Sequence, residues 1–242
     1  MTLYRERTYR KKANAGDLVS FHVAVRETDL WVSADRNLEK DTIDLILDCR
    51  YQLETYIRSH SVFLTSLKPL HEDHCAPPIA KEMIDATKEL DVGPMASVAG
   101  AVAQYVGKGL LQFTDQVIVE NGGDIFLKTR RPATVSVLAG SSPLSGKFGL
   151  LIPVKQMPSG VCASSATVGH SLSTGIADVV CLVSSSAALA DGAATALGNR
   201  IKIKADLERV GLWADNIEGI RGGLVIAEDR MAAWGDIELV EL

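Results

Sequence analysis

The 242-residue chain lacks the excess of positive charge that nucleic-acid-binding proteins carry. Its 25 basic and 30 acidic residues give a formal net charge of -5 at pH 7. Affinity for phosphate backbones depends on concentrated positive charge, so this balance argues against a nucleic-acid partner. The basic run "YRERTYRKK" (4–12) is local. Charge runs near termini are most simply solvated arms, and the alternative is a patch for anionic lipid or RNA.

Long apolar runs and an export signal are also missing. The first residues are charged and contain no apolar core of a secretory signal. No apolar run reaches the roughly 18–20 residues that a bilayer-spanning helix needs. We therefore expect a cytoplasmic protein without a membrane-embedded part.

Cysteine is scarce, and no two cysteines form a CxxC pair. The four cysteines stand far apart in the sequence, which in a chain of this length predicts reduced thiols. Cys162 and His170 could form a nucleophile–base pair, because an imidazole can accept the proton of a thiol. Ordinary packing of Cys162 is the simpler interpretation.

Apolar residues, in contrast, make up 47% of the chain, which is enough for a sizeable core. We expect one domain over residues 1–242, or two tightly fused halves. Strand patterns occupy 18–25, 30–34, 116–120, 124–129, 133–140, 148–154 and 177–185, followed by a terminal hairpin. Helical patterns follow Asp35, a candidate cap, and occupy 79–90, 94–111, 187–199 and 204–212. Elements that come in blocks rather than in alternation predict an α+β fold with a mostly antiparallel sheet.

Two segments resemble ligand-binding motifs only superficially. In "GSSPLSGK" (140–147), five residues separate the glycines where a phosphate-binding P-loop has four, and Phe148 stands where Ser or Thr would hold magnesium. In "HEDHC" (71–75), the side chains could ligate a metal, but their spacing fits no tetrahedral zinc pattern. We expect a loop in both places.

The helix "AALADGAATALGN" (187–199) carries the most informative side chains. Asp191 and Thr195 are four residues apart, so they share one face of the helix. A carboxylate and a hydroxyl one turn apart offer two hard oxygen ligands to Mg²⁺, which takes its other ligands from phosphates and water. The surrounding Ala, Leu and Gly predict a buried helix, and a buried carboxylate needs a partner. That partner could be a metal or a buried Arg.

The stretch "VIVENGGDIFL" (117–127) has two interpretations. Apolar runs flank Asn121, Gly122, Gly123 and Asp124. These four residues fit the tight turn of a β-hairpin, and they equally fit a backbone cradle for a phosphate-bearing ligand. The stretch alone does not decide between them.

Taken in order, several segments resemble the ApbE-type flavin transferases, the FAD:protein FMN transferases. The segments are "NGGDI" (121–125), "ASSA" (163–166), "HSLSTG" (170–175) and "AALADGAATAL" (187–197), and the resemblance spans residues 93–198. The family's "AKG" lysine has no counterpart in "MASVAGA", and its "HxxDPxTG" is shortened here to "HSLSTG". The chain looks most similar to the cytosolic branch without an assigned activity.

The resemblance implies an ApbE-like fold with a pocket for a flavin or a diphosphate. It implies Mg²⁺ ligation by Asp191 and Thr195. It places the ligand against a set of residues from the turn and the Ser-rich segment: Asn121, Gly122, Gly123, Asp124, Ser164, Ser165 and His170. Among these, His170 is the candidate acid–base group.

The leading hypothesis is a Mg²⁺-dependent enzyme that acts on FAD or a related nucleotide diphosphate, either transferring FMN to a protein acceptor or hydrolysing the diphosphate. The alternatives are a non-catalytic flavin or nucleotide binder and a structural homo-oligomer, since terminal hairpins and small-residue helices could pair.

Overall fold

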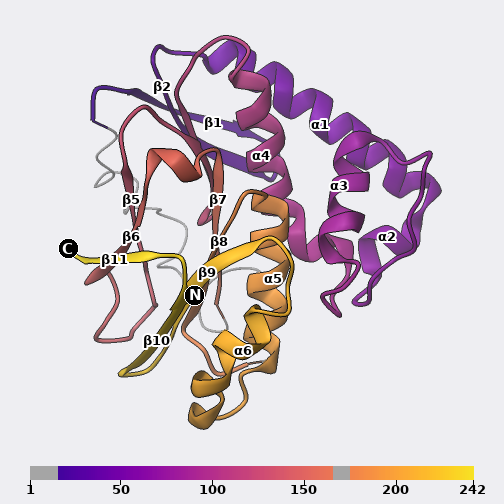
Figure 1. Ribbon diagram of the computed structural model, residues 1–242. Coiled ribbons are helices and arrows are strands. Elements are labelled where there is room, and N and C mark those ends of the chain that lie inside the picture. The colour runs from indigo at the N-terminus through magenta and orange to yellow at the C-terminus, as the bar shows by residue number, and fades with distance from the viewer. Residues whose placement is uncertain (1–15, 166–174) are drawn as a thin grey trace.

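The computed structural model describes residues 16–165 and 175–242 (Figure 1). The helices are α1 (Glu39–Ser59), α2 (Ser61–Thr65), α3 (Pro78–Thr87), α4 (Val98–Leu110), α5 (Ala187–Arg200) and α6 (Val210–Ala214). Short 3-10 helices cover Pro94–Ser97, Val154–Gln156 and Lys204–Arg209. The strands are β1 (Val19–Val25), β2 (Thr28–Ala34), β3 (Val117–Asn121), β4 (Asp124–Lys128), β5 (Ala133–Ser136), β6 (Phe148–Ile152), β7 (Ser159–Ser164), β8 (Val179–Ser184), β9 (Ile220–Ala227), β10 (Arg230–Gly235) and β11 (Glu238–Glu241).

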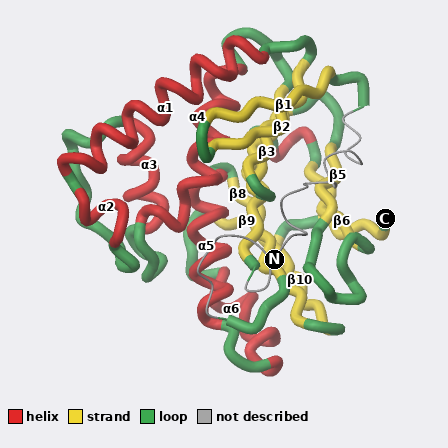
Figure 2. The backbone as a smooth tube through the Cα atoms, turned by 180° about the vertical axis from the view of Figure 1, so that it is seen from behind, coloured by secondary structure: helices red, strands yellow, loops and turns green. Residues whose placement is uncertain are grey.

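The elements form three layers, with a large sheet in the middle. The 8-stranded sheet has the order β1-β2-β3-β4-β7-β8-β9-β10, and a 3-stranded sheet has the order β11-β6-β5. The paired strands are antiparallel. The helices lie on one side of the large sheet and the small sheet on the other (Figure 2). The predicted α+β fold with a mostly antiparallel sheet is therefore confirmed.

The large sheet is buried on both faces, as its central strands show. In β8, Val180 and Leu182 face the core beneath the helices. Val179, Cys181 and Val183 face the second core, toward the small sheet. Because successive side chains of a strand point to opposite faces, a strand between two cores must be apolar throughout. This explains the unbroken run "VVCLV".

Some local predictions are confirmed and others are wrong. Either Ser185 or Ser186 could cap α5 by sequence, and the structure shows that Ser186 does so, its side chain accepting the N–H of Leu189. Asp35 does not cap α1, which begins after Leu38. Its carboxylate instead accepts hydrogen bonds from Thr114 Oγ1 and Gln116 Nε2, both at 2.7 Å.

The segments 71–75 and 140–147 lie in loops, as predicted. In the part of the chain that the structure describes, no group of three or more His, Cys, Asp or Glu side chains is arranged to hold a metal ion. The four cysteines are free thiols. No helix among the described residues has both the length and the apolar character to cross a bilayer.

Candidate functional site

Four elements distant in sequence meet beside the N-terminus of α4. They are α4 itself, the β3–β4 turn, the end of β7 and the middle of α5. Helix α5 packs on β7, β8 and α4, and α4 in turn packs on β3 and β4. In Figure 1, α4 lies above α5 on the same side of the strands. The predicted site residues within the described ranges lie on three of these elements and in Ser165 just after β7.

Asp191 projects from α5 to the first turn of α4. Its Oδ2 accepts the backbone N–H of Gly100 at 2.9 Å, and the Ala99 N–H also hydrogen-bonds this carboxylate. The first N–H groups of a helix have no partner within the helix, so a carboxylate is well placed there. Gly100 makes the approach feasible, because a Cβ at this position would lie 2.8 Å from the Cβ of Asp191.

Asp124 is the first residue of β4 and is also buried. Its Oδ1 accepts the backbone N–H of Ala163 in the neighbouring strand β7, at 3.2 Å. Its side chain is near enough to Asp191 for the charge of one to act on the other. The fold thus brings two carboxylates together in a place from which water is largely excluded.

Burial controls the ionisation of both acids. It raises the pKa of Asp124 well above its usual value, and the charge of Asp191 raises it further. Burial also raises the pKa of Asp191 to about 7, although the N–H groups of Gly100 and Ala99 oppose the shift. Among residues 16–165 and 175–242, no Lys, Arg or His lies within salt-bridge distance of either carboxylate. The described chain therefore contains no buried Arg partner for Asp191.

Thr195 and Ser164 extend the polar cluster by two hydroxyls. Thr195 lies one helical turn beyond Asp191, and its Oγ1 donates to Ser164 Oγ at 3.4 Å. Both residues are buried. Ser165 is partly exposed. His170, the predicted acid–base group, lies outside the described residues.

The segment from Asn121 to Asp124 is a two-residue hairpin turn. Asn121 pairs with Asp124, and the glycines between them have φ angles of 68° and 110°. Asn121 Nδ2 donates to the Ala99 carbonyl at 3.0 Å, which ties the turn to the start of α4. The Gly123 N–H donates to Glu120 Oε1 at 2.7 Å. A Cβ on Gly123 would meet no atom within 4 Å, so the space beside the turn is open. The turn interpretation holds, and contact with a ligand stays a prediction.

The donor set fits a hard divalent cation. Asp124, Asp191 and Thr195 offer carboxylate and hydroxyl oxygens, which Mg²⁺ prefers to nitrogen or sulfur. Asp124 accepts the Ala163 N–H with its Oδ1, and Asp191 accepts the Gly100 N–H with its Oδ2. A cation held here would take few protein side chains and fill its shell from phosphate and water.

Cys162 lies next to this cluster as a neutral thiol. Its side chain is fully buried, and its Sγ donates to the Ala187 carbonyl at 3.2 Å. Burial, followed by the charges of Asp124 and Asp191, raises the pKa of this thiol well above its usual value. A thiolate nucleophile is therefore disfavoured at this position.

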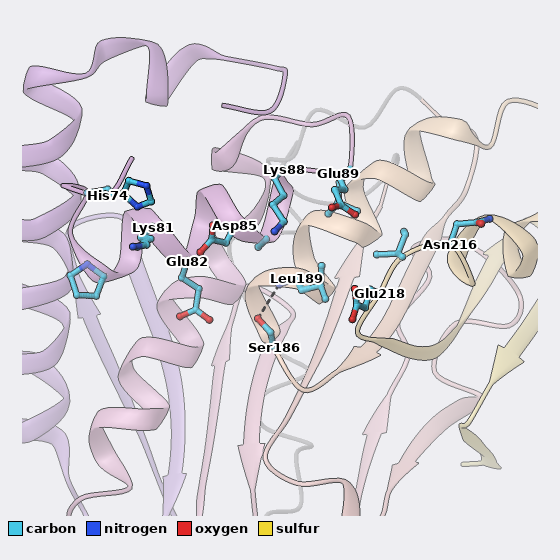
Figure 3. Close-up of a pocket in the computed structure, with 15 residues that line it drawn as sticks. His74, Lys81, Glu82, Asp85, Lys88, Glu89, Ser186, Leu189, Asn216 and Glu218 are labelled. Atoms are coloured by element: carbon cyan, nitrogen blue, oxygen red, sulfur yellow. Dashed lines mark hydrogen bonds between the residues drawn. The ribbon is translucent and has the colours of Figure 1, made fainter. Parts of the chain in front are cut away.

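A separate groove of about 750 Å³ opens between α3 and the start of α5. Figure 3 shows charged side chains of α3 along it, with Ser186 and Leu189 from α5 and Glu218 from the loop after α6. None of the predicted site residues that the structure describes lines this groove. The carboxylate pair is therefore the candidate site, because among the described residues the side chains of this mixed-charge groove form no cluster that could hold a metal ion.

Sequence reasoning missed the backbone of Ala99 and the side chain of Gln104. Gln104 is fully buried in α4, and its Oε1 accepts the Ala187 N–H at 2.7 Å. The available signal was a lone polar residue in the apolar run "AGAVAQYVG".

The chain is similar to known proteins over most of its length. The family model described as AbpE bacteria matches residues 10–214. A UPF0280 protein of Methanocaldococcus jannaschii is 38% identical over 226 residues, covering 90% of this chain and 92% of its own length. Another from Methanospirillum hungatei is 41% identical over 220 residues, covering 89% and 87%.

Two solved structures share the fold at low identity. A variant of the flavin transferase ApbE from Vibrio cholerae has a TM-score of 0.58 at 13% identity, covering 91% of this chain and 97% of its own. The flavinyl transferase ApbE of Pseudomonas stutzeri, in its apo form, has a TM-score of 0.58 at 11% identity, covering 93% and 94%. The extent of the family match and the identity to these relatives show that the chain belongs to the ApbE-like family, in the branch of the UPF0280 proteins.

Proposed function

We propose that this protein is a Mg²⁺-dependent enzyme that acts on FAD or a related nucleotide diphosphate. The observation that carries the proposal is the pair of buried carboxylates, Asp124 and Asp191, with no cationic side chain beside them among the described residues. Two such charges in a site of low polarity are unfavourable unless a proton or a cation is present.

Each side chain of the site would have a distinct role. Asp191 and Thr195 would hold the cation from one face of α5, and Asp124 would complete the set from β4. When bound, Mg²⁺ would neutralise charge that develops on the phosphate oxygens. The open space beside Gly123 would admit the ligand next to the turn. Ser164 and Ser165 would line the neighbouring wall, and His170 would transfer a proton at the diphosphate.

Product analysis tests the proposal directly. The protein is incubated with FAD and Mg²⁺, with and without candidate acceptor proteins, and AMP and FMN are separated by chromatography. AMP together with FMN on the acceptor indicates the transferase, and AMP with free FMN indicates the pyrophosphatase. Asp191→Asn is the matched control and should release neither product.

The rival function is a non-catalytic flavin or nucleotide binder. The sequence supports it, since the segment "HSLSTG" is shorter than the family motif and a lysine counterpart is missing. Tight FAD binding without AMP release under every condition would establish this rival. Absence of any thermal shift across a flavin and nucleotide panel would leave a structural oligomer.

A further inference from the structure

Gln104 is a buried amide whose two ends are both engaged. Its side chain is fully buried within α4. Its Oε1 accepts the backbone N–H of Ala187 at 2.7 Å, and its Nε2 donates to Glu82 Oε1. A carboxylate can only accept and a backbone N–H can only donate, so the orientation of this amide is determined by its neighbours.

Ala187 joins α5 to neighbouring elements through its N–H, its carbonyl and its Cβ. It is the first residue of α5, so its N–H has no partner within the helix. Its carbonyl accepts the Cys162 thiol, and a Cβ on Gly160 would lie 2.8 Å from its own Cβ. Asp191 lies four positions later in the same helix. A shift or rotation of α5 at Ala187 would therefore also move the Asp191 carboxylate.

Glu82 connects Ala187, through Gln104, to the groove between α3 and α5. It lies on α3, lines the groove shown in Figure 3 and forms an ion pair with Lys108 at 3.7 Å. A chain of polar contacts therefore runs from Glu82 on α3 through Gln104 on α4 to the start of α5.

We propose that Gln104 is a positioning residue that sets the register of α5 and so holds Asp191 opposite Asp124 in the geometry that a divalent cation needs. The inference rests on the proposed function, because it assigns the cation to these carboxylates. Gln104 itself hydrogen-bonds Glu82 and Ala187 rather than either carboxylate. It acts through Ala187, as groups behind the ligands of a metal site commonly do.

The test uses Mn²⁺ as the probe, with the full chain and FAD, and follows free Mn²⁺ by electron paramagnetic resonance. Gln104→Met keeps the volume and removes both hydrogen bonds. Removing groups behind metal ligands typically weakens binding by about 10–100-fold, and we expect a loss in this range. Gln52→Met is the matched control, since Gln52 donates hydrogen bonds to Asp48 and Tyr105, which lie on α1 and α4 rather than on α5. It should retain the parent's affinity.

A charge swap separates positioning from simple packing. Gln104→Glu alone places two carboxylates against each other and should weaken Mn²⁺ binding. The Ala187 N–H can still be accepted by an oxygen at position 104, and adding Glu82→Gln restores the contact between the two side chains with donor and acceptor exchanged, so the double variant should recover the parent's affinity. This rescue also decides the case if Gln104→Met does not fold.

Each outcome has a definite meaning. Parental affinity in a folded Gln104→Met protein, or a folded double variant that still binds weakly, overturns the inference and leaves the proposed function standing. Failure of both to fold would show a purely structural role and also overturn it. A parent protein that binds no Mn²⁺, with Asp191→Asn indistinguishable from it, overturns the proposed function and this inference together.

Discussion

At the scale of single residues, Asp191 and Asp124 are acids whose charge the fold makes unfavourable. Backbone N–H groups of Gly100 and Ala163 partly compensate them, and among the described residues no Lys, Arg or His does so. Burial favours the protonated forms, and their mutual repulsion adds to this. A bound cation would reverse the preference and favour the carboxylates.

The first prediction concerns Asp191→Asn. Asn has nearly the same size and can still accept the Gly100 N–H, but it lacks the charge that binds a hard cation. The variant should fold, and without metal at pH 8 it should be more stable than the parent by up to roughly 4 kcal/mol, because the pKa of Asp191 is raised from 3.8 to about 7 and each unit corresponds to about 1.4 kcal/mol. Thermal melts with and without Mg²⁺ plus FAD check this. An equal ligand-induced shift in both proteins would exclude the metal role.

The second prediction concerns pH. The folded protein holds a proton on Asp191 up to a pKa of about 7, whereas the unfolded chain releases it near 3.8. Between these values the folded state binds more protons, so metal-free stability should fall as pH rises, by at most about 1.4 kcal/mol per pH unit for one proton. Urea unfolding in a chelator from pH 5.5 to 8 measures the slope. Asp191→Asn should make the slope of stability against pH shallower. A slope equal to the parent's would contradict the raised pKa of Asp191.

At the scale of elements, the α4–α5 contact determines the site. The two helices approach closely at Gly100, since a Cβ there would meet the Ala187 backbone and the Asp191 side chain. A glycine inside a helix costs about 1 kcal/mol relative to Ala. The close packing of two helices offsets that cost and gives Asp191 access to the first N–H groups of α4.

The third prediction tests this contact with Gly100→Ala. The new methyl must push α5 away from α4, so we expect a loss of about 1–3 kcal/mol, as for other overpacked sites, together with weaker Mg²⁺ binding. Gly109→Ala is the control on the same helix, where the Cβ would meet only the flexible Leu45 side chain. Urea unfolding and cation titration of both variants give the comparison. Equal losses of stability and of cation affinity in the two variants would contradict a particular role of the α4–α5 contact in the site.

At the scale of the whole molecule, the central sheet joins two cores. Strands β7, β8 and β9 contribute side chains to the core under the helices and to the core under the small sheet. Removing either layer would expose apolar surface on these strands, and burial of that surface is the main stabilising term of a fold.

The fourth prediction is that residues 1–242 unfold as one cooperative unit. Trp31 on β2 and Trp234 on β10 report on strands near opposite edges of the large sheet. Single-tryptophan variants should give urea transitions that coincide with each other and with circular dichroism. Two separate midpoints would instead indicate two fused halves.

The sequence by itself determined what depends on near neighbours. Periodicity located most helices and strands, and the two glycines after Asn121 fit a hairpin turn. The spacing of Asp191 and Thr195 placed both on one face of a helix. These features follow from local backbone preference and side-chain periodicity, which neighbouring residues settle.

Only the tertiary structure decided which distant groups meet. Asp35 is a residue type that commonly caps helices, yet it hydrogen-bonds Thr114 and Gln116, because the pairing of β2 with β3 brings these residues beside it. The sequence did not show that Asp191 of α5 accepts a hydrogen bond from the first turn of α4 and lies near Asp124, or that Gln104 accepts the N–H of Ala187. Such contacts depend on how whole helices and strands pack, and so the carboxylate pair exists only in the folded chain.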